Sequence, residues 1–220
     1  MIEAAISVQR PGNTARADTL PCVFVVDDDI SVRESLELLL NAAGWQATSF
    51  ACAADFLAYP KVSGPSCLVL DVGLPDVNGL DLQDRFAPGG ATTPIIFITG
   101  AADIPMTVRA MKAGAVEFLT KPVCDDALLT AIERALEVSS AQLRREAELM
   151  ALRNRYASLT RREAEVMPLV VAGRLNKQVA FELGISEITV KAHRGKLMRK
   201  MVARTLPDLV KMAARLGIAA

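Results

Sequence analysis

Five residues with polar side chains stand at or just beyond the ends of apolar segments that have the length of a strand. They are Asp27, Asp28, Asp71, Thr99 and Lys121. Three carboxylates cannot share one small site without a cation, because like charges a few ångströms apart repel strongly. Oxygen ligands with room for water and phosphate favour Mg²⁺. A carboxylate beside a metal ion, a hydroxyl group and an amine predicts phosphoryl transfer, with Asp71 as nucleophile and Lys121 as a stabiliser of charge.

Each of these residues, taken singly, has an ordinary structural explanation. An aspartate after a strand usually forms a turn or a helix cap, and a Lys-Pro pair usually lies in a surface turn. The set is more informative than its members, because they follow strand ends in a fixed order along the chain.

The elements that must position these residues alternate between strand and helix. Apolar runs of strand length cover residues 22–26, 67–70, 95–99 and 115–119, and residues 46–50 form a weaker fifth. Helical patterns lie between them at residues 31–43, 53–59, 80–86 and 104–113. Five such units predict an α/β doubly wound (βα)5 fold with a parallel sheet. In the strand order 2-1-3-4-5 the first and third strands are neighbours, so the three carboxylates converge at one sheet edge.

A long helix is expected from Asp125 to about Tyr156. Four apolar residues along it fall seven positions apart: Leu129, Leu136, Leu143 and Met150. The complementary heptad positions are polar, which favours a solvated linker over residues 138–157. A coiled coil in this segment is the alternative.

The C-terminal residues predict a small all-α domain with four helices. Each helix has a capping residue, expected at Thr160, Asn176, Ser186 and Thr205. Glu163 completes a capping box with Thr160, and Pro168 lies inside the helix that follows. The third helix, Glu187–Met201, carries basic residues on one face, which is either a solvated surface or a surface that binds a polyanion.

Charge is distributed unevenly between the two halves. The chain has 25 basic and 25 acidic residues and a net charge of zero. Residues 1–137 carry 18 acids and 9 bases, whereas residues 138–220 carry 7 acids and 16 bases. An acidic half joined to a basic half suggests two tasks, and the basic half suggests nucleic acid as a ligand.

The remaining composition excludes several classes of protein. The four cysteines form no C-x-x-C pair and the chain has one histidine, so a zinc site is not expected. The cysteines are expected to be free thiols in the cytoplasm. No apolar run reaches 18 residues, which predicts no membrane span. Residues 1–20 lack the apolar stretch of a signal peptide and are expected to form a flexible tail.

Four stretches of the first half resemble the receiver domains of two-component response regulators. They are Val25-Val-Asp-Asp-Asp29 with Ser31-Val-Arg33, Leu70-Asp-Val-Gly-Leu-Pro-Asp-Val-Asn-Gly79, Phe97-Ile-Thr-Gly100 and Ala110-Met-Lys-Ala-Gly-Ala-Val-Glu-Phe-Leu-Thr-Lys-Pro122. The resemblance implies that Asp71 is phosphorylated by a histidine kinase. It also implies that Asp28, Asp71 and the Gly73 carbonyl bind Mg²⁺, with Asp27 assisting through water.

The same resemblance assigns further residues. Thr99 and Lys121 would hold the phosphoryl oxygens, and the Lys121–Pro122 bond would be cis. Phe118 would be the aromatic residue of the conformational switch; an ordinary core ring is the alternative. Relatives often carry larger groups at the positions of Gly73 and Ala101, where such groups influence the lifetime of the phosphoryl group.

The second half resembles the LuxR-type DNA-binding domain through the stretches Leu159-Thr-x-Arg-Glu163, Asn176-Lys-Gln-Val-Ala180, Leu183-Gly-Ile-Ser186 and Thr189-Val-Lys191. Together the two halves look like the FixJ/NarL group, most of all its FixJ-like and styrene-regulator-like members. Lys191 and Arg194 would then reach bases or phosphates. The residues expected to hold the DNA backbone are Asn176, Lys177, Thr189, His193 and Lys196. Gly195 departs from the bulkier residues of some relatives.

The resulting hypothesis divides the chain into a tail at 1–20, a receiver at 21–137, a linker at 138–157 and a helix-turn-helix domain at 158–220. Phosphorylation would cause two copies to pair through the surface that includes Met106, Val108 and Met111, and the dimer would bind inverted half-sites in promoter DNA and act on RNA polymerase. Two alternatives remain: a haloacid-dehalogenase-like phosphatase with Asp27 as nucleophile, and a receiver whose basic domain binds a protein or RNA.

Overall fold

The computed structural model describes residues 20–60, 62–86, 93–101 and 103–218. The chain divides into two compact units between Ser140 and Ala141, and each is described by itself. Apart from Leu20, the tail expected at residues 1–20 lies outside the described residues. No helix within the described ranges is both long and apolar enough to cross a membrane.

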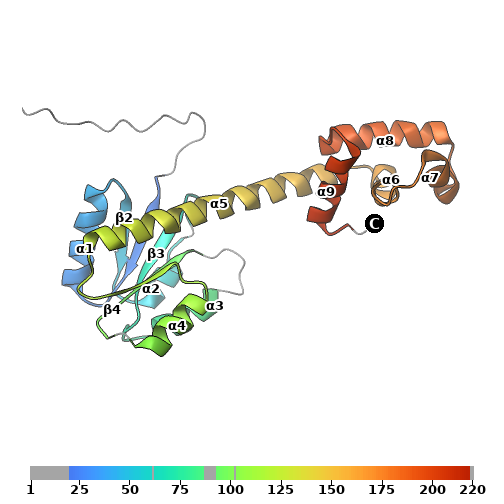
Figure 1. Ribbon diagram of the computed structural model, residues 1–220. Coiled ribbons are helices and arrows are strands. Elements are labelled where there is room, and N and C mark those ends of the chain that lie inside the picture. The colour runs from blue at the N-terminus through green and yellow to red at the C-terminus, as the bar shows by residue number, and fades with distance from the viewer. Residues whose placement is uncertain (1–19, 61, 87–92, 102, 219–220) are drawn as a thin grey trace, which may run out of the picture. The chain divides into compact units, whose positions relative to one another are not determined.

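The first unit is a parallel sheet of five strands in the order β2-β1-β3-β4-β5 (Figure 1). Its strands are β1 Cys22–Val26, β2 Gln46–Phe50, β3 Ser66–Asp71, β4 Ile95–Thr99 and β5 Glu117–Thr120. Its helices are α1 Ile30–Ala42, α2 Ala53–Ala58, α3 Gly79–Phe86, α4 Ile104–Lys112 and α5 Asp125–Ala157. The predicted doubly wound fold and strand order are confirmed.

Two cores lie on opposite faces of this sheet, because successive residues of a strand point to opposite sides. Phe24 and Leu68 pack with residues of α2, α3 and α4 on one face. Val23 and Val69 pack with residues of α1 and α5 on the other. Covering both faces with helices leaves the strand ends as the place where polar groups gather.

Helix α5 contributes to both units. Ile132 and Leu136 belong to the core beneath the sheet, and the Ser139 hydroxyl accepts a hydrogen bond of 3.0 Å from the buried backbone N–H of Ser66. Further along, Leu152 is buried in the core of the second unit, whereas Met150 is 57% exposed. The segment expected to be a linker thus takes part in packing at each of its ends.

The second unit is built from the end of α5 and four further helices: α6 Arg161–Val171, α7 Asn176–Leu183, α8 Glu187–Met201 and α9 Leu206–Leu216. The side chains of Thr160, Ser186 and Thr205 cap α6, α8 and α9 as predicted. The prediction that Asn176 caps α7 is wrong.

Asn176 is instead the first residue of α7, and Leu175 occupies the cap position. A leucine side chain has no acceptor, but the Leu175 N–H donates to the Gln178 side chain at 2.9 Å. The Asn176 carboxamide accepts a hydrogen bond from Arg194 at 3.2 Å. The Asn176 side chain, which the local sequence assigned to capping, is therefore used in a contact with a different helix.

Glu163 is a buried carboxylate at the centre of the second unit. Its Oε2 accepts hydrogen bonds from Lys200 Nζ at 2.7 Å and from the Thr160 N–H at 2.9 Å. Lys200 also donates to the Ser158 carbonyl at 2.9 Å. The Lys200 hydrogen bond, followed by the backbone bond of Thr160, lowers the pKa of Glu163 to about 2.

Replacing Glu163 by glutamine should lower the free energy of unfolding of the second unit by about 1–3 kcal/mol, because Lys200 loses its charged partner. In the wild type, the Glu163 carboxyl of the unfolded state has a pKa of about 4.3, which is higher than in the folded state. As pH falls, the unfolded state therefore takes up a proton before the folded state does. The stabilisation should be complete above about pH 5 and decline towards pH 2.

Urea unfolding followed by circular dichroism at several pH values measures this effect. Trp45, the single tryptophan of the chain, lies in the first unit, so the unfolding transition followed by its fluorescence should not change. The matched control is Glu165→Gln on the same helix, whose partners Arg161 and Arg162 are more than half exposed. Equal effects of the two substitutions would contradict the assignment to the buried ion pair.

Candidate metal centre and nucleic-acid interface

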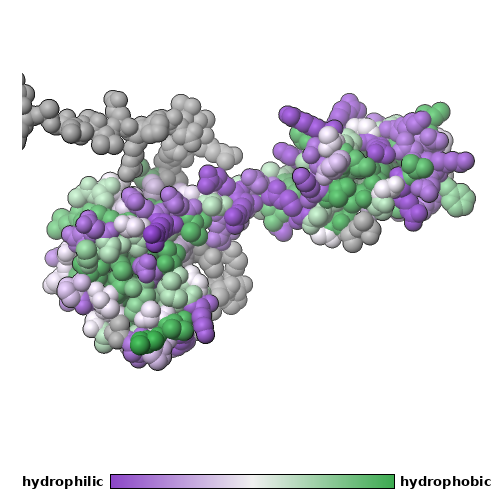
Figure 2. All heavy atoms as spheres, viewed as in Figure 1, coloured by the Kyte–Doolittle hydropathy of each residue, from purple (hydrophilic) through white to green (hydrophobic). Residues whose placement is uncertain are grey.

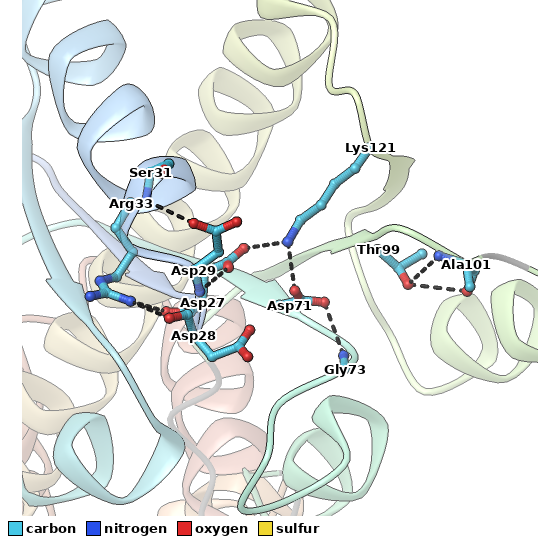
Figure 3. A network of polar contacts seen from close by, with 10 residues as sticks. All are labelled: Asp27, Asp28, Asp29, Ser31, Arg33, Asp71, Gly73, Thr99, Ala101 and Lys121. Carbon is cyan, nitrogen blue, oxygen red and sulfur yellow. Dashed lines mark hydrogen bonds and ion pairs between the residues drawn. The ribbon is translucent and has the colours of Figure 1, made fainter.

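Three carboxylates meet at the carboxyl ends of β1 and β3. The two strands are paired, with Val26 opposite Leu70, so the residues that follow lie side by side. Ligand oxygens of Asp27, Asp28 and Asp71 lie within 4.8 Å of one another (Figure 3). Asp27 and Asp71 are buried and Asp28 is exposed. The predicted convergence of these residues at one sheet edge is what the structure shows.

Lys121 joins two of the carboxylates. Its Nζ lies 2.6 Å from Asp27 Oδ2 and 2.6 Å from Asp71 Oδ2, although the two aspartates are on different strands (Figure 3). Desolvation lowers the pKa of Lys121, but its hydrogen bonds to Asp27 and Asp71 outweigh this and raise it. Burial raises the pKa of Asp27, against the opposing effect of Lys121. The ammonium group thus remains charged and partly neutralises the carboxylates.

The loop after β3 surrounds Asp71 closely. The Gly73 N–H donates to Asp71 Oδ1 at 2.9 Å. A Cβ on Gly79 would lie 2.6 Å from the Asp71 carbonyl oxygen, so this position requires glycine. A Cβ on Gly73 would lie 3.7 Å from Asp71 Oδ1, an ordinary contact, so Gly73 leaves room beside the carboxylate.

Arg33 supports the aspartate pair from α1. Its NH1 donates to the carbonyl oxygens of Asp27 at 2.7 Å and Asp28 at 2.9 Å. The Asp29 N–H donates to Asp27 Oδ1 at 3.0 Å. Arg33 was part of a stretch that resembles receiver domains, but sequence reasoning assigned it no role.

Thr99 and Phe118 lie on the neighbouring strands β4 and β5. The Thr99 hydroxyl donates to the Ala101 carbonyl at 3.1 Å and accepts from the Ala101 N–H at 3.3 Å, so its hydrogen bonds stay within its own loop (Figure 3). Phe118 is partly buried, with its ring centroid 6.1 Å from that of Phe97. The Lys121–Pro122 bond is cis, as expected.

These donors fit a divalent cation of the Mg²⁺ type. The cluster offers carboxylate oxygens only, which are the hard ligands that Mg²⁺ prefers, and the exposed Asp28 leaves an open side for water and phosphate. Lys121 neutralises part of the charge on Asp27 and Asp71, and Asp28 lies outside that pair of contacts. A second cation therefore complements the site rather than duplicating Lys121.

Helix α8 carries five basic residues of the second unit, and hydrophilic side chains cover its surface (Figure 2). Val190 and Leu197 are buried, whereas Lys191 and Lys196 are exposed. Ile188 lies on the same helix and is 79% exposed. The exposed face of α8 therefore includes an apolar side chain that could contact a base.

The other residues expected to bind DNA differ in their exposure and in the hydrogen bonds that they make within the protein. The Arg194 guanidinium is held by Asn176, and the Thr189 N–H donates to the Ser186 hydroxyl at 3.1 Å. Lys177 is exposed on α7. His193 is partly buried, and its Nδ1 has no protein partner among the described residues. A Cβ on Gly195 would meet nothing within 4 Å, so packing does not require glycine there.

Two protein families match the chain. Residues 23–133 match the response regulator receiver domain, and residues 157–213 match the bacterial regulatory proteins of the luxR family. Nodulation protein W of Bradyrhizobium diazoefficiens is 48% identical over 209 residues, covering 95% of this chain and 92% of that protein. Transcriptional regulatory protein FixJ of Azorhizobium caulinodans is 41% identical over 202 residues, covering 92% and 95%.

Solved structures agree with this result. The response regulator StyR is 46% identical and matches with a TM-score of 0.79, covering 90% of this chain and all of that one. Full-length FixJ from B. japonicum is 40% identical, with a TM-score of 0.53 and coverage of 90% and 98%. These matches exclude the phosphatase alternative, which required Asp27 as nucleophile in a different family. The chain belongs to the two-component response regulators and, with its receiver and LuxR-type DNA-binding domains, is a transcriptional regulator of that family.

Proposed function

We propose that Asp71 accepts a phosphoryl group from a sensor histidine kinase and that this modification controls binding to promoter DNA in the cytoplasm. The observation that carries the proposal is the position of the Asp71 carboxylate, which lies within 4.8 Å of two further carboxylates and 2.6 Å from the Lys121 ammonium. Such a set is suited to forming an acyl phosphate and stabilising its charge.

In the proposed reaction a carboxylate oxygen of Asp71 attacks the phosphorus atom of phosphohistidine. The new O–P bond forms as the P–N bond breaks, and the departing imidazole takes up a proton. Mg²⁺ held by Asp28, Asp71 and the Gly73 carbonyl, with Asp27 assisting through water, would supply positive charge to the phosphoryl oxygens. Lys121 is the protein's own cation beside the acceptor. Beyond this self-phosphorylation and a slow loss of the phosphoryl group, no enzymatic activity is proposed.

Acetyl phosphate with Mg²⁺ should add one phosphoryl group to the wild-type protein. Asp71→Asn should abolish the addition because the nucleophile is lost, and a chelator should prevent it in the wild type. Intact-protein mass spectrometry gives the result directly. Asp81→Asn is the control, since Asp81 is a half-exposed aspartate on α3 that pairs with Arg109. Phosphorylation of Asp71→Asn would refute the assignment.

The phosphoryl group would act through Thr99 and Phe118. The Thr99 hydroxyl now bonds to Ala101, and a phosphoryl oxygen on Asp71 would attract it away from that loop. The space it leaves would admit the Phe118 ring, which is already partly buried against the core. The surface of α4, β5 and α5 would change shape and pair with the same surface of a second copy.

The apolar residues expected on the pairing surface differ in exposure. Val108 and Met111 are 44% and 43% exposed, whereas Met106 is partly buried and packs against the sheet core. Ile104, at the start of α4, is 80% exposed and adds an apolar side chain to the proposed surface.

Sedimentation velocity with and without beryllofluoride, a phosphoryl mimic, should show a change from monomer to dimer at micromolar protein. Met111→Glu should prevent the change because it places a carboxylate in an apolar contact. Leu38→Glu is the control, since Leu38 is 73% exposed on α1, away from the pairing surface. If sedimentation is unchanged while Asp71 is occupied, dimerisation is not the switch.

DNA binding would use α8 in the major groove of each inverted half-site, with half-sites about 34 Å apart for a two-fold dimer. The LuxR-type domain and the relatives named as transcriptional regulators favour DNA over the protein or RNA alternative. Contacts between the two α9 helices would help to fix the half-site spacing.

Lys191→Ala should weaken binding to a selected operator and reduce the slope of log K against log salt by about 0.9 if the side chain contacts a phosphate. Arg194→Ala should do the same or relax specificity at one base pair by about 1–3 kcal/mol. Fluorescence anisotropy over a range of salt concentrations measures both. Arg161→Ala, which removes a 93% exposed cation from α6, is the control, and affinities unchanged by the α8 substitutions would show that the recognition helix is misassigned.

A further inference from the structure

Gln83 on α3 has a polar side chain that the core of the first unit does not satisfy. It is 5% exposed, and Leu80 and Leu82 of the same helix are buried in the core on this face of the sheet. The Gln83 Oε1 atom is buried and has no hydrogen-bond partner among the described residues. A buried polar group without a partner is rare and unfavourable, and such groups are found where a protein stores strain.

The other end of the same amide group contacts α4. Gln83 Nε2 donates a hydrogen bond of 3.3 Å to the carbonyl oxygen of Ala110. That carbonyl oxygen also accepts the Ala115 N–H at 3.1 Å, in the turn that ends α4. A carbonyl oxygen can only accept, so rotating the amide by half a turn would give Oε1 no partner there. The contact with α4 therefore leaves Oε1 unpaired.

Helix α4 has few other contacts that fix its position. Among its nine residues, all of them described, Ala110 is the one that is buried, and a methyl group buries little apolar area. Arg109 and Asp81 form an ion pair of 2.7 Å between α4 and α3, but both side chains are about half exposed, where such pairs contribute little. The position of α4 against α3 is therefore sensitive to the buried amide of Gln83.

Two effects of Gln83 oppose each other in the present contact between α3 and α4, which we call the closed arrangement. The hydrogen bond to Ala110 stabilises it, but at 3.3 Å this bond is long. The unpaired Oε1 has lost its hydration without compensation, and this penalty exceeds the net gain from one neutral hydrogen bond. When α4 moves away from α3, water reaches the amide and satisfies both of its polar atoms. Gln83 therefore disfavours the closed arrangement.

We propose that the unpaired amide oxygen of Gln83 shifts α4 towards the arrangement that follows phosphorylation of Asp71. The inference rests on the proposed function, in which the surface of α4, β5 and α5 changes shape and pairs with a second copy. It adds to that function the residue that sets how easily α4 leaves the closed arrangement. Because Gln83 is buried, it lies outside the pairing surface and acts on the equilibrium between two positions of α4.

Gln83→Met tests the inference in the full-length protein, because methionine has a similar length and no strong hydrogen-bonding group. The closed arrangement would lose its unpaired oxygen and become more stable. Sedimentation velocity with saturating beryllofluoride should then give a dimer dissociation constant about tenfold higher than that of the wild type. Without beryllofluoride, hydrogen exchange of the α4 amides should slow by about tenfold, because α4 opens less often. The urea midpoint followed by Trp45 fluorescence should rise.

Two further variants separate the amide from the rest of the contact. Gln83→Leu removes the amide with a different apolar shape, so it should act in the same direction as Gln83→Met. Asp81→Asn removes the exposed ion pair between the same two helices, which favours the closed arrangement, so dimerisation should become stronger, by a few fold at most. Circular dichroism should show that all three variants are folded.

Three results would overturn the inference. If Gln83→Met raises the urea midpoint but changes neither dimerisation nor exchange of the α4 amides, Gln83 has a structural role alone. If Gln83→Met strengthens dimerisation, the hydrogen bond to Ala110 outweighs the unpaired oxygen and Gln83 holds α4 in place. Equal weakening by Asp81→Asn would show that any change between α3 and α4 impairs pairing.

Failure of the proposed function gives a different result. If the wild type forms no dimer with beryllofluoride, the proposed pairing fails. Exchange of the α4 amides in Gln83→Met then decides the role of Gln83 by itself, because exchange without beryllofluoride needs no second copy. Slower exchange supports the inference, and unchanged or faster exchange refutes it.

Discussion

The ammonium group of Lys121, shared between the carboxylates of Asp27 and Asp71, is the interaction on which the acidic site depends. Asp27 is fully buried and Asp71 nearly so. Two buried carboxylates this close together would be strongly unfavourable without a counter-charge. Removing one partner of a buried ion pair typically costs about 3–5 kcal/mol because a charge is left uncompensated. The three residues belong to three different strands or their following loops, so the ion pairs also hold the carboxyl edge of the sheet together.

Other contacts around the acidic site are made to backbone groups. Arg33 binds the carbonyl groups of Asp27 and Asp28 and not their carboxylates. Gly79 lets the loop after β3 approach the Asp71 backbone at a distance that no Cβ would permit. The site is thus assembled by contacts to the backbone and by hydrogen bonds to the carboxylates from Lys121, Gly73 and Asp29.

The second unit also contains a buried charge that needs partners. Its buried charge, Glu163, is satisfied by Lys200 from α8 and by the cap of α6, and this places the recognition helix against the start of the domain. The same helix holds Arg194 to Asn176 on α7. Polar contacts between helices therefore fix which face of α8 is exposed, and with it the side chains that DNA can meet.

The sequence by itself determined the fold class, because the alternation of strands and helices follows from local periodicity. The convergence of the three carboxylates followed once the strand order common to doubly wound sheets was assumed, and the structure has that order. Helix caps at Thr160, Ser186 and Thr205 were equally predictable, because their partners lie three residues away.

Tertiary structure decided what depends on contacts between distant residues. The sharing of Lys121 by Asp27 and Asp71 spans 94 and 50 residues, and no local pattern encodes it. Asn176 lost its predicted capping role to Arg194, 18 residues away, and Met106 turned inward while Ile104 and Ile188 turned outward. Periodicity identifies an apolar side of a helix to within about one residue, but the neighbouring elements select which side chains at its margin are covered.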